Sequence, residues 1–155
     1  MNPVRFFSLM AMTLWLGWLC APALADDTSQ PMVSPDFSTD PGQAVVYVYR
    51  DRMLKGSAMP YVGYLNDEKI GLIENGEYMR YVAVPSDYDL WITNVPERAH
   101  GARFSVTLKE VDFKPGEIYF YKIVPMFGFY WTLEIHSVDA VTARQEILTL
   151  YEKVK

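Results

Sequence analysis

The two histidines of the chain are the natural starting point for acid–base or nucleophilic chemistry. His100 lies in a loop-like stretch beside a glycine, and His136 lies near the end of an alternating segment. A hydrolase needs a base within reach of a nucleophile, and Ser57, Ser86 and Ser105 are available. None of these serines has the context of a nucleophile elbow. We predict no catalytic residue and keep a small hydrolase as an alternative function.

Metal-binding side chains are present but scattered. The histidines and carboxylates lack the close spacing of a zinc site. Methionines bind soft copper when they cluster, yet only Met53 and Met59 are near each other in the sequence. Glu74 and Glu77 flank an Asn-Gly pair, which is typical of a solvated hairpin tip. We therefore predict no metal site and no cofactor.

An apolar stretch at 125–130 is the first candidate for binding. It joins two predicted strands, so it is expected to be a surface loop, and an apolar surface loop is typical of a contact site. The candidate contact residues are Met126, Phe127, Phe129 and Tyr130. The alternative is that these side chains fold back and close the end of the core, which Gly128 would permit.

Four tyrosines on two predicted strands are the second candidate. Tyr47 and Tyr49 alternate on one strand, and Tyr119 and Tyr121 alternate on another. If the two strands pair, the four rings would form an aromatic face able to stack on sugars or peptides. Burial beneath a C-terminal helix is the alternative.

The elements that must position these residues are mostly short strands. Alternating or β-branched and aromatic runs, separated by turn residues, predict eight strands. They cover 44–50, 61–65, 70–73, 78–84, 89–93, 103–109, 118–124 and 130–136. Asn66–Lys69 predicts a hairpin turn, and Asn75-Gly76 is the strongest hairpin signal of the chain, of type I′.

The C-terminal segment has a helical period. Apolar residues step by three and four along one stripe, which predicts an amphipathic helix at about 139–153 with Ser137 or Asp139 as its N-cap. The stripe consists of Ala140, Ala143, Ile147, Leu150 and Val154. Many short strands followed by one helix predict a mainly β protein, an antiparallel β-sandwich with a C-terminal amphipathic helix.

The first twenty-five residues have the layout of a secretory signal. Arg5 precedes an apolar run over 6–19, and Ala23-Leu24-Ala25 provides a small-residue cleavage site. The run is too short to span a bilayer as a helix. We expect cleavage after Ala25 and a periplasmic or secreted protein, with an uncleaved anchor or a lipoprotein acylated at Cys20 as alternatives. Residues 26–43 are polar and predict a flexible lead to the domain at 44–155; a short ordered segment covering a sheet edge is the alternative.

The amino-acid composition limits the classes of partner that we expect the protein to bind. The chain has a formal net charge of −5 and no basic cluster, which argues against nucleic acid and anionic membrane surfaces. Its single cysteine, Cys20, leaves with the predicted signal. We predict a mature domain without disulfides and without a transmembrane span.

Several motifs together resemble a known family. They are the strand Val45–Arg50, the hairpin at 64–71, the Gly-Glu-Tyr strand start at 76–78 and the Lys-Pro-Gly-Glu turn at 114–117 before an aromatic strand. This order is similar to the domain of unknown function 2846 family, small exported bacterial proteins and lipoproteins. The chain differs at Pro85–Tyr88, where the pattern has Pro-x-Gly-x-Tyr. The resemblance implies a sandwich of the transthyretin or carboxypeptidase-regulatory type and transfers no catalytic residue.

These observations lead to one expected function. We expect an exported, non-enzymatic β-sandwich that binds an envelope protein partner or a small ligand. A small envelope hydrolase and a carbohydrate-binding module using the tyrosine face are the alternatives.

Overall fold

The computed structural model of the protein describes residues 34–94, 105–127 and 131–152. The predicted signal sequence and its cleavage site, His100, Phe129, Tyr130 and Val154 lie outside these residues. The elements in chain order are β1 (Ala44–Tyr49), β2 (Tyr61–Leu65), β3 (Glu68–Ile73), β4 (Glu77–Ala83), β5 (Ser86–Thr93), β6 (Ser105–Phe113), β7 (Ile118–Phe127), β8 (Trp131–Ser137), α1 (Ala140–Ile147) and β9 (Tyr151–Glu152). No helix within this described part of the chain is long and apolar enough to cross a membrane.

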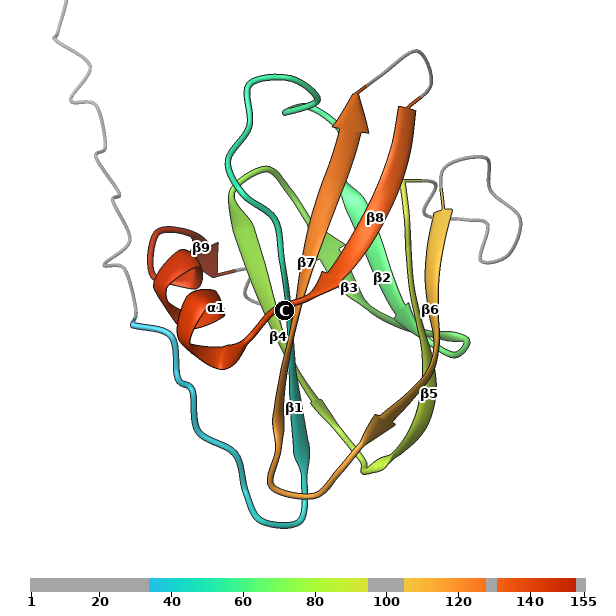
Figure 1. The fold of residues 1–155 in the computed structure, drawn as a ribbon, viewed down its shortest axis with the longest axis vertical. Coiled ribbons are helices and arrows are strands. Elements are labelled where there is room, and N and C mark those ends of the chain that lie inside the picture. Colours follow the sequence, from blue (N-terminus) through green and yellow to red (C-terminus); the bar gives the residue numbers. More distant parts are fainter. Residues whose placement is uncertain (1–33, 95–104, 128–130, 153–155) are drawn as a thin grey trace, which may run out of the picture. The chain divides into compact units, whose positions relative to one another are not determined.

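The strands form two sheets that pack into a sandwich (Figure 1). The five-stranded sheet has the order β8-β7-β1-β4-β9, and the four-stranded sheet has the order β3-β2-β5-β6. Most neighbours are antiparallel, whereas β1–β7 and β4–β9 are parallel. The predicted mainly β fold, a β-sandwich with one C-terminal helix, is confirmed.

One hairpin prediction is confirmed and the other is wrong. β2 and β3 pair around the turn at Asn66, where φ is 51°. At Asn75-Gly76 no hairpin forms, because β3 and β4 belong to different sheets. Gly76 has φ 78°, whereas Asn75 is not among the described residues with positive φ, so the turn is not type I′. The Asn75 side chain instead binds a neighbouring loop, and the chain crosses from one sheet to the other here.

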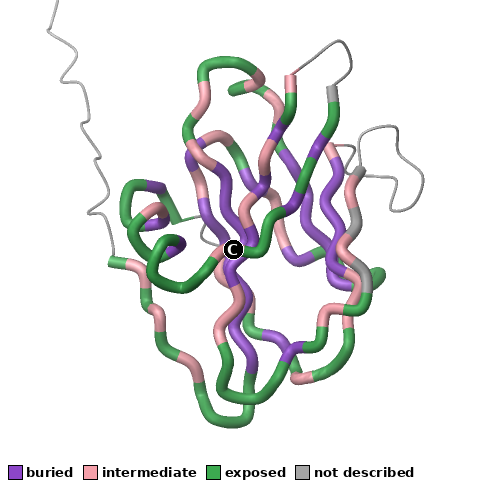
Figure 2. The backbone as a smooth tube through the Cα atoms, in the orientation of Figure 1, coloured by how far each residue is buried: buried purple, intermediate pink, exposed green. Residues whose placement is uncertain are grey.

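Two large clusters of buried apolar side chains lie on the two faces of the five-stranded sheet, and a smaller one, Val62, Tyr64 and Trp91, lies on the four-stranded sheet. The inner core lies between the sheets, and the helix-side cluster lies between the five-stranded sheet and α1 (Figure 2). The inner core consists of Ala44, Val46, Val48, Tyr61, Leu65, Ile70, Ile73, Met79, Ala83, Leu90, Ile92, Phe113, Tyr121, Ile123, Leu133 and Ile135. The helix-side cluster consists of Val45, Tyr47, Tyr49, Tyr78, Phe120, Ala143, Ile147 and Leu150. Strand β1 is therefore buried on both faces, as its continuous apolar run predicts.

The C-terminal helix is shorter than its apolar stripe predicts. Asp139 is the N-cap, and its carboxylate accepts hydrogen bonds from the Val141 and Thr142 amides. The helix ends at Ile147 instead of about 153. The following residues return to the sheet, where the Tyr151 amide donates to the Gly76 carbonyl at 3.0 Å and β9 pairs with β4.

Residues 34–43, the described part of the predicted lead, have no regular structure but contact the sheet. The Phe37 ring lies 5.4 Å from the Tyr47 ring, and the Tyr47 hydroxyl donates to the Asp36 carbonyl. Arg80 donates to the Ser38 carbonyl at 3.0 Å. This segment packs on the helix side of the five-stranded sheet.

Candidate functional site

The predicted face of four tyrosines does not form. β1 and β7 do pair, but their parallel register sets Tyr47 opposite Phe120 and Tyr121 opposite Val48. Residues opposite each other in a ladder share a face, so the two tyrosine pairs point to opposite sides of the sheet. Tyr119 and Tyr121 point towards the inner core, while Tyr47 and Tyr49 lie in the helix-side cluster.

Burial also removes these rings from a binding role. Tyr47 and Tyr49 are fully buried under α1, and Tyr121 is 4% exposed. Burial raises the pKa of Tyr121 to about 12. The Tyr119 hydroxyl is held at the chain turn by the Lys114 amide at 2.9 Å. The prediction of one exposed face of four tyrosines is therefore wrong. Burial beneath the C-terminal helix, the alternative, holds for Tyr47 and Tyr49 but not for Tyr119 and Tyr121.

The apolar stretch at 125–130 is strand as far as the structure describes it. Pro125, Met126 and Phe127 extend β7 beyond its predicted end and pair with β8. Pro125 is buried opposite Leu133, whereas Met126 is 45% exposed. Phe127 is half-buried against another loop, as Gly56 and Lys55 lie over its ring. The role of this stretch as a contact site stays a prediction.

The loop at 51–60 joins Met126 and Phe127 at one end of the sandwich. It connects β1 to β2 and lies beside the end of β7 (Figure 1). Leu54 at its tip is fully exposed, between the basic residues Arg52 and Lys55. We call the residues 51–60, 74–76, Met126 and Phe127 the loop end. Leu54 lies in no periodic pattern of the sequence and was therefore not predicted as a candidate contact residue.

A buried arginine anchors the 51–60 loop by hydrogen bonds to its main chain. Arg50 is fully buried at the end of β1, and its guanidinium donates to the Met59 carbonyl at 2.6 Å and the Gly56 carbonyl at 2.8 Å. The guanidinium also lies 4.8 Å from the Tyr61 ring centre. Burial lowers the pKa of Arg50. Within the described residues it makes no ion pair with a carboxylate, so its charge is balanced by loop carbonyls and an aromatic ring.

Asn75 anchors the same loop by a second set of hydrogen bonds to its main chain. Its amide nitrogen donates to the Met53 carbonyl at 2.9 Å, and its amide oxygen accepts from the Met53 backbone nitrogen at 2.8 Å. This pair of bonds copies one step of a β-ladder. The Arg52 side chain packs against Gly76 and lies over the Tyr151 ring. The Asn-Gly signal in the sequence therefore marks a clamp on the loop.

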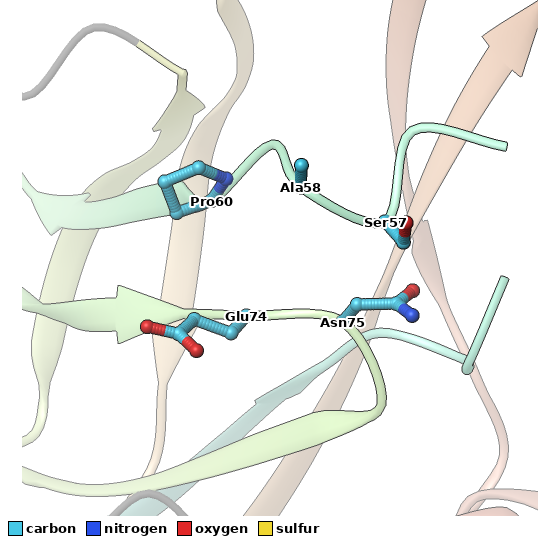
Figure 3. A pocket seen from close by; sticks show the side chains of 5 residues that line it. All are labelled: Ser57, Ala58, Pro60, Glu74 and Asn75. Carbon is cyan, nitrogen blue, oxygen red and sulfur yellow. The ribbon is translucent and has the colours of Figure 1, made fainter. Parts of the chain in front are cut away.

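A pocket of about 300 Å³ opens between these two segments (Figure 3). Its lining residues are Ser57, Ala58, Pro60, Glu74 and Asn75. It lies where the β2–β3 ladder ends at Tyr61 and Ile73, because Pro60 has no amide hydrogen with which to continue the ladder. The lining offers a hydroxyl, a carboxylate and an amide beside two small apolar side chains, a set suited to binding a small polar group.

A charged network ties the start of the loop to the helix. The Lys122 ammonium lies 2.8 Å from both the Asp51 and the Glu146 carboxylates, and the Tyr49 hydroxyl donates to Glu146 at 2.6 Å. Burial alone would raise the pKa of Glu146, but the bonds from Lys122 and Tyr49 lower it. Burial alone would lower the pKa of Lys122, but its two carboxylate partners raise it. Both shifts favour the charged forms of Lys122 and Glu146, which suits a structural role.

The described residues bring no catalytic set together. His136 is exposed, and its Nε2 lies 2.8 Å from the Glu134 carboxylate, away from the pocket. The Met59 sulfur accepts from Asn94, and Met79 packs against Gly71 in the core, so these methionines fill space. Within the described residues, no group of three histidine, cysteine or acidic side chains could hold a metal ion.

Comparison with protein-family models, with curated proteins and with solved structures gives no match to this chain. The resemblance to the domain of unknown function 2846 family therefore stays a prediction.

Proposed function

We propose that this protein is an exported, non-enzymatic binding protein of the bacterial envelope that contacts another envelope protein or a small ligand through its loop end. The observation that carries the proposal is Leu54, fully exposed at the tip of a loop that a buried arginine holds in place. An exposed leucine on a fixed loop can bind a partner without a large loss of conformational freedom on binding.

Several features of the chain support export. The signal-like layout of residues 1–25 predicts secretion, and the only cysteine lies within it. The family resemblance implies an exported bacterial protein. We therefore place the partner in the periplasm or at the cell surface.

The arrangement of the loop end supports binding over catalysis. The general base of a serine nucleophile is most often a histidine, whereas the polar side chains that line the pocket are Ser57, Glu74 and Asn75. The two clamps, Arg50 and Asn75, bind the main chain of the loop and so fix its shape. The pocket and Leu54 share this loop, so a partner could engage both.

Charge substitutions at the loop end test the proposal. We expect Leu54→Glu and Met126→Glu to reduce capture of native partners from envelope extracts at least tenfold, with an unchanged melting temperature. Val84→Glu is the matched control, because Val84 is 74% exposed and lies at the opposite end of the sandwich. Undiminished capture by both loop-end variants would refute the proposal.

A further inference from the structure

Strand β8 differs from the other sheet edges because it is neither bulged nor very short. The described strands leave four edges, formed by β8, β9, β3 and β6. β3 and β6 each carry a bulge that interrupts their ladder, and β9 has only two residues. Bulges and very short strands are known ways of preventing further strand pairing. By contrast, the β7–β8 register runs without a shift from Phe127–Trp131 to Tyr121–Ser137.

The sequence of β8 is also suited to pairing. Trp131–Ser137 contains no proline, glycine or lysine. Leu133 and Ile135 point into the inner core, which leaves the charged residues on the outer face. There the His136 Nε2 lies 2.8 Å from the Glu134 carboxylate, and both side chains are about half exposed. No described strand pairs with the free side of β8.

We infer that β8 pairs with β8 of a second copy of this chain, antiparallel, about a two-fold axis through Ile135. This register places Glu134 opposite His136 of the second copy, and His136 opposite Glu134 of the second copy. Each Glu134–His136 pair thus occurs twice, as the symmetry of an isologous interface requires. The five-stranded sheets of two copies would join into one continuous sheet.

The charges on β8 select this register over its neighbours. An axis through Glu134 would set the two Glu134 carboxylates opposite each other, which is unfavourable because like charges directly opposite destabilise a ladder. An axis through His136 would set Glu134 opposite Val138 and so remove the Glu134–His136 pairs. A shift of one residue would place the inward face of one strand against the outward face of the other, which the core excludes.

The residue opposite His136 on β7 leaves the imidazole available to a second copy. That residue is Lys122, and its ammonium is already bound by Asp51 and Glu146. The interface would consist of one strand pair and its side chains, a small area. We therefore expect a weak dimer that forms as the concentration rises.

Sedimentation of the chain, expressed with its own leader and purified as the cell processes it, tests the inference. We expect dimers to accumulate between about 10 µM and about 1 mM. Glu134→Lys and His136→Glu should each raise the dimer dissociation constant roughly tenfold, because each lost pair occurs twice. The double variant Glu134→Lys/His136→Glu restores opposite charges across the interface and should recover most of the affinity.

Asp87→Lys is the matched control. It makes the same charge change at an exposed site on β5, in the other sheet, and should leave dimerisation unchanged. Circular dichroism identifies any variant that fails to fold. A chain that stays monomeric throughout the concentration range would overturn the inference. So would a dimer that both single substitutions leave intact, or one that the double variant fails to restore.

Discussion

The two ends of the sandwich are built differently. At the turn end, which holds the turns at 66–67, 84–85 and 114–117, short connections join consecutive strands. Some of their hydrogen bonds stay close to the turn, as when the Tyr88 hydroxyl donates to the Val84 carbonyl, and others reach a neighbouring strand, as when the Asp89 amide donates to the Asn66 side chain. At the loop end, the much longer 51–60 connection is held by Arg50 and Asn75. A buried guanidinium without a carboxylate costs desolvation energy that a short turn would avoid.

The difference indicates that the loop end serves more than chain closure. The turn at Asn66 shows that this chain can join β2 to β3 with two residues. The 51–60 loop instead holds Leu54 outside the core on a frame of buried polar bonds. Such a frame fixes the shape of a surface, which is what specific binding requires.

Removal of the buried arginine should have the largest effect. Arg50→Leu leaves the Met59 and Gly56 carbonyls without their donor, and we expect a loss of about 2–3 kcal/mol in the free energy of unfolding. Trypsin should then cleave at Arg52 and Lys55 much faster than in the wild type, since the loop loses its anchor. Lys69→Leu, an exposed change at the turn end, is the control and should alter neither property. Equal protease resistance of both variants would remove the distinction between the ends.

A methyl group at Gly56 should have a smaller effect. Gly56 has φ 76°, and a Cβ there would lie 2.6 Å from the Phe127 ring. We expect Gly56→Ala to cost about 1–2 kcal/mol in chemical denaturation, through strain and the displaced ring. Gly42→Ala is the counterpart at the turn end, where no atom lies within 4 Å. If the two substitutions had the same effect, the close packing of the loop on β7 would be disproved.

The network at Glu146 should affect stability through pH. The pKa of Glu146 is lowered in the folded state, so its contribution is present at neutral pH and is lost as pH falls through that lowered pKa. We expect Glu146→Gln to cost about 1 kcal/mol at neutral pH, since Lys122 and Tyr49 lose a charged partner. The cost should disappear in acid, as measured by thermal unfolding across pH. A pH-independent difference would show that the carboxylate charge is not what stabilises the site.

Much of the fold could be predicted from the sequence because it follows from local patterns. The alternation in β8, the apolar run of β1 and the cap at Asp139 all describe residues that interact with near neighbours. The hairpin prediction at Asn75 failed for a physical reason. Its amide binds Met53, 22 residues away, and nothing in a local turn signal contains that contact.

The candidate site was harder to predict for the same reason. The parallel β1–β7 register decides which face of the sheet each tyrosine points to. That register joins segments about seventy residues apart. Leu54 has no periodic pattern around it, and its importance depends on Arg50, an arginine that ends an apolar run. The sequence signal for this anchor was a charged residue directly after a strand predicted to be buried. Only the structure shows that it is fully buried.

Site-specific photo-cross-linking in living cells is the most direct test of the loop end as the binding surface. A photoreactive residue replaces Leu54 in one variant and Val84 in another, since both native side chains are largely exposed. We predict a discrete adduct from position 54, none from position 84, and loss of the position-54 adduct in an Arg50→Leu background. An adduct from position 84 with none from position 54, or equal adducts from both, would contradict the account.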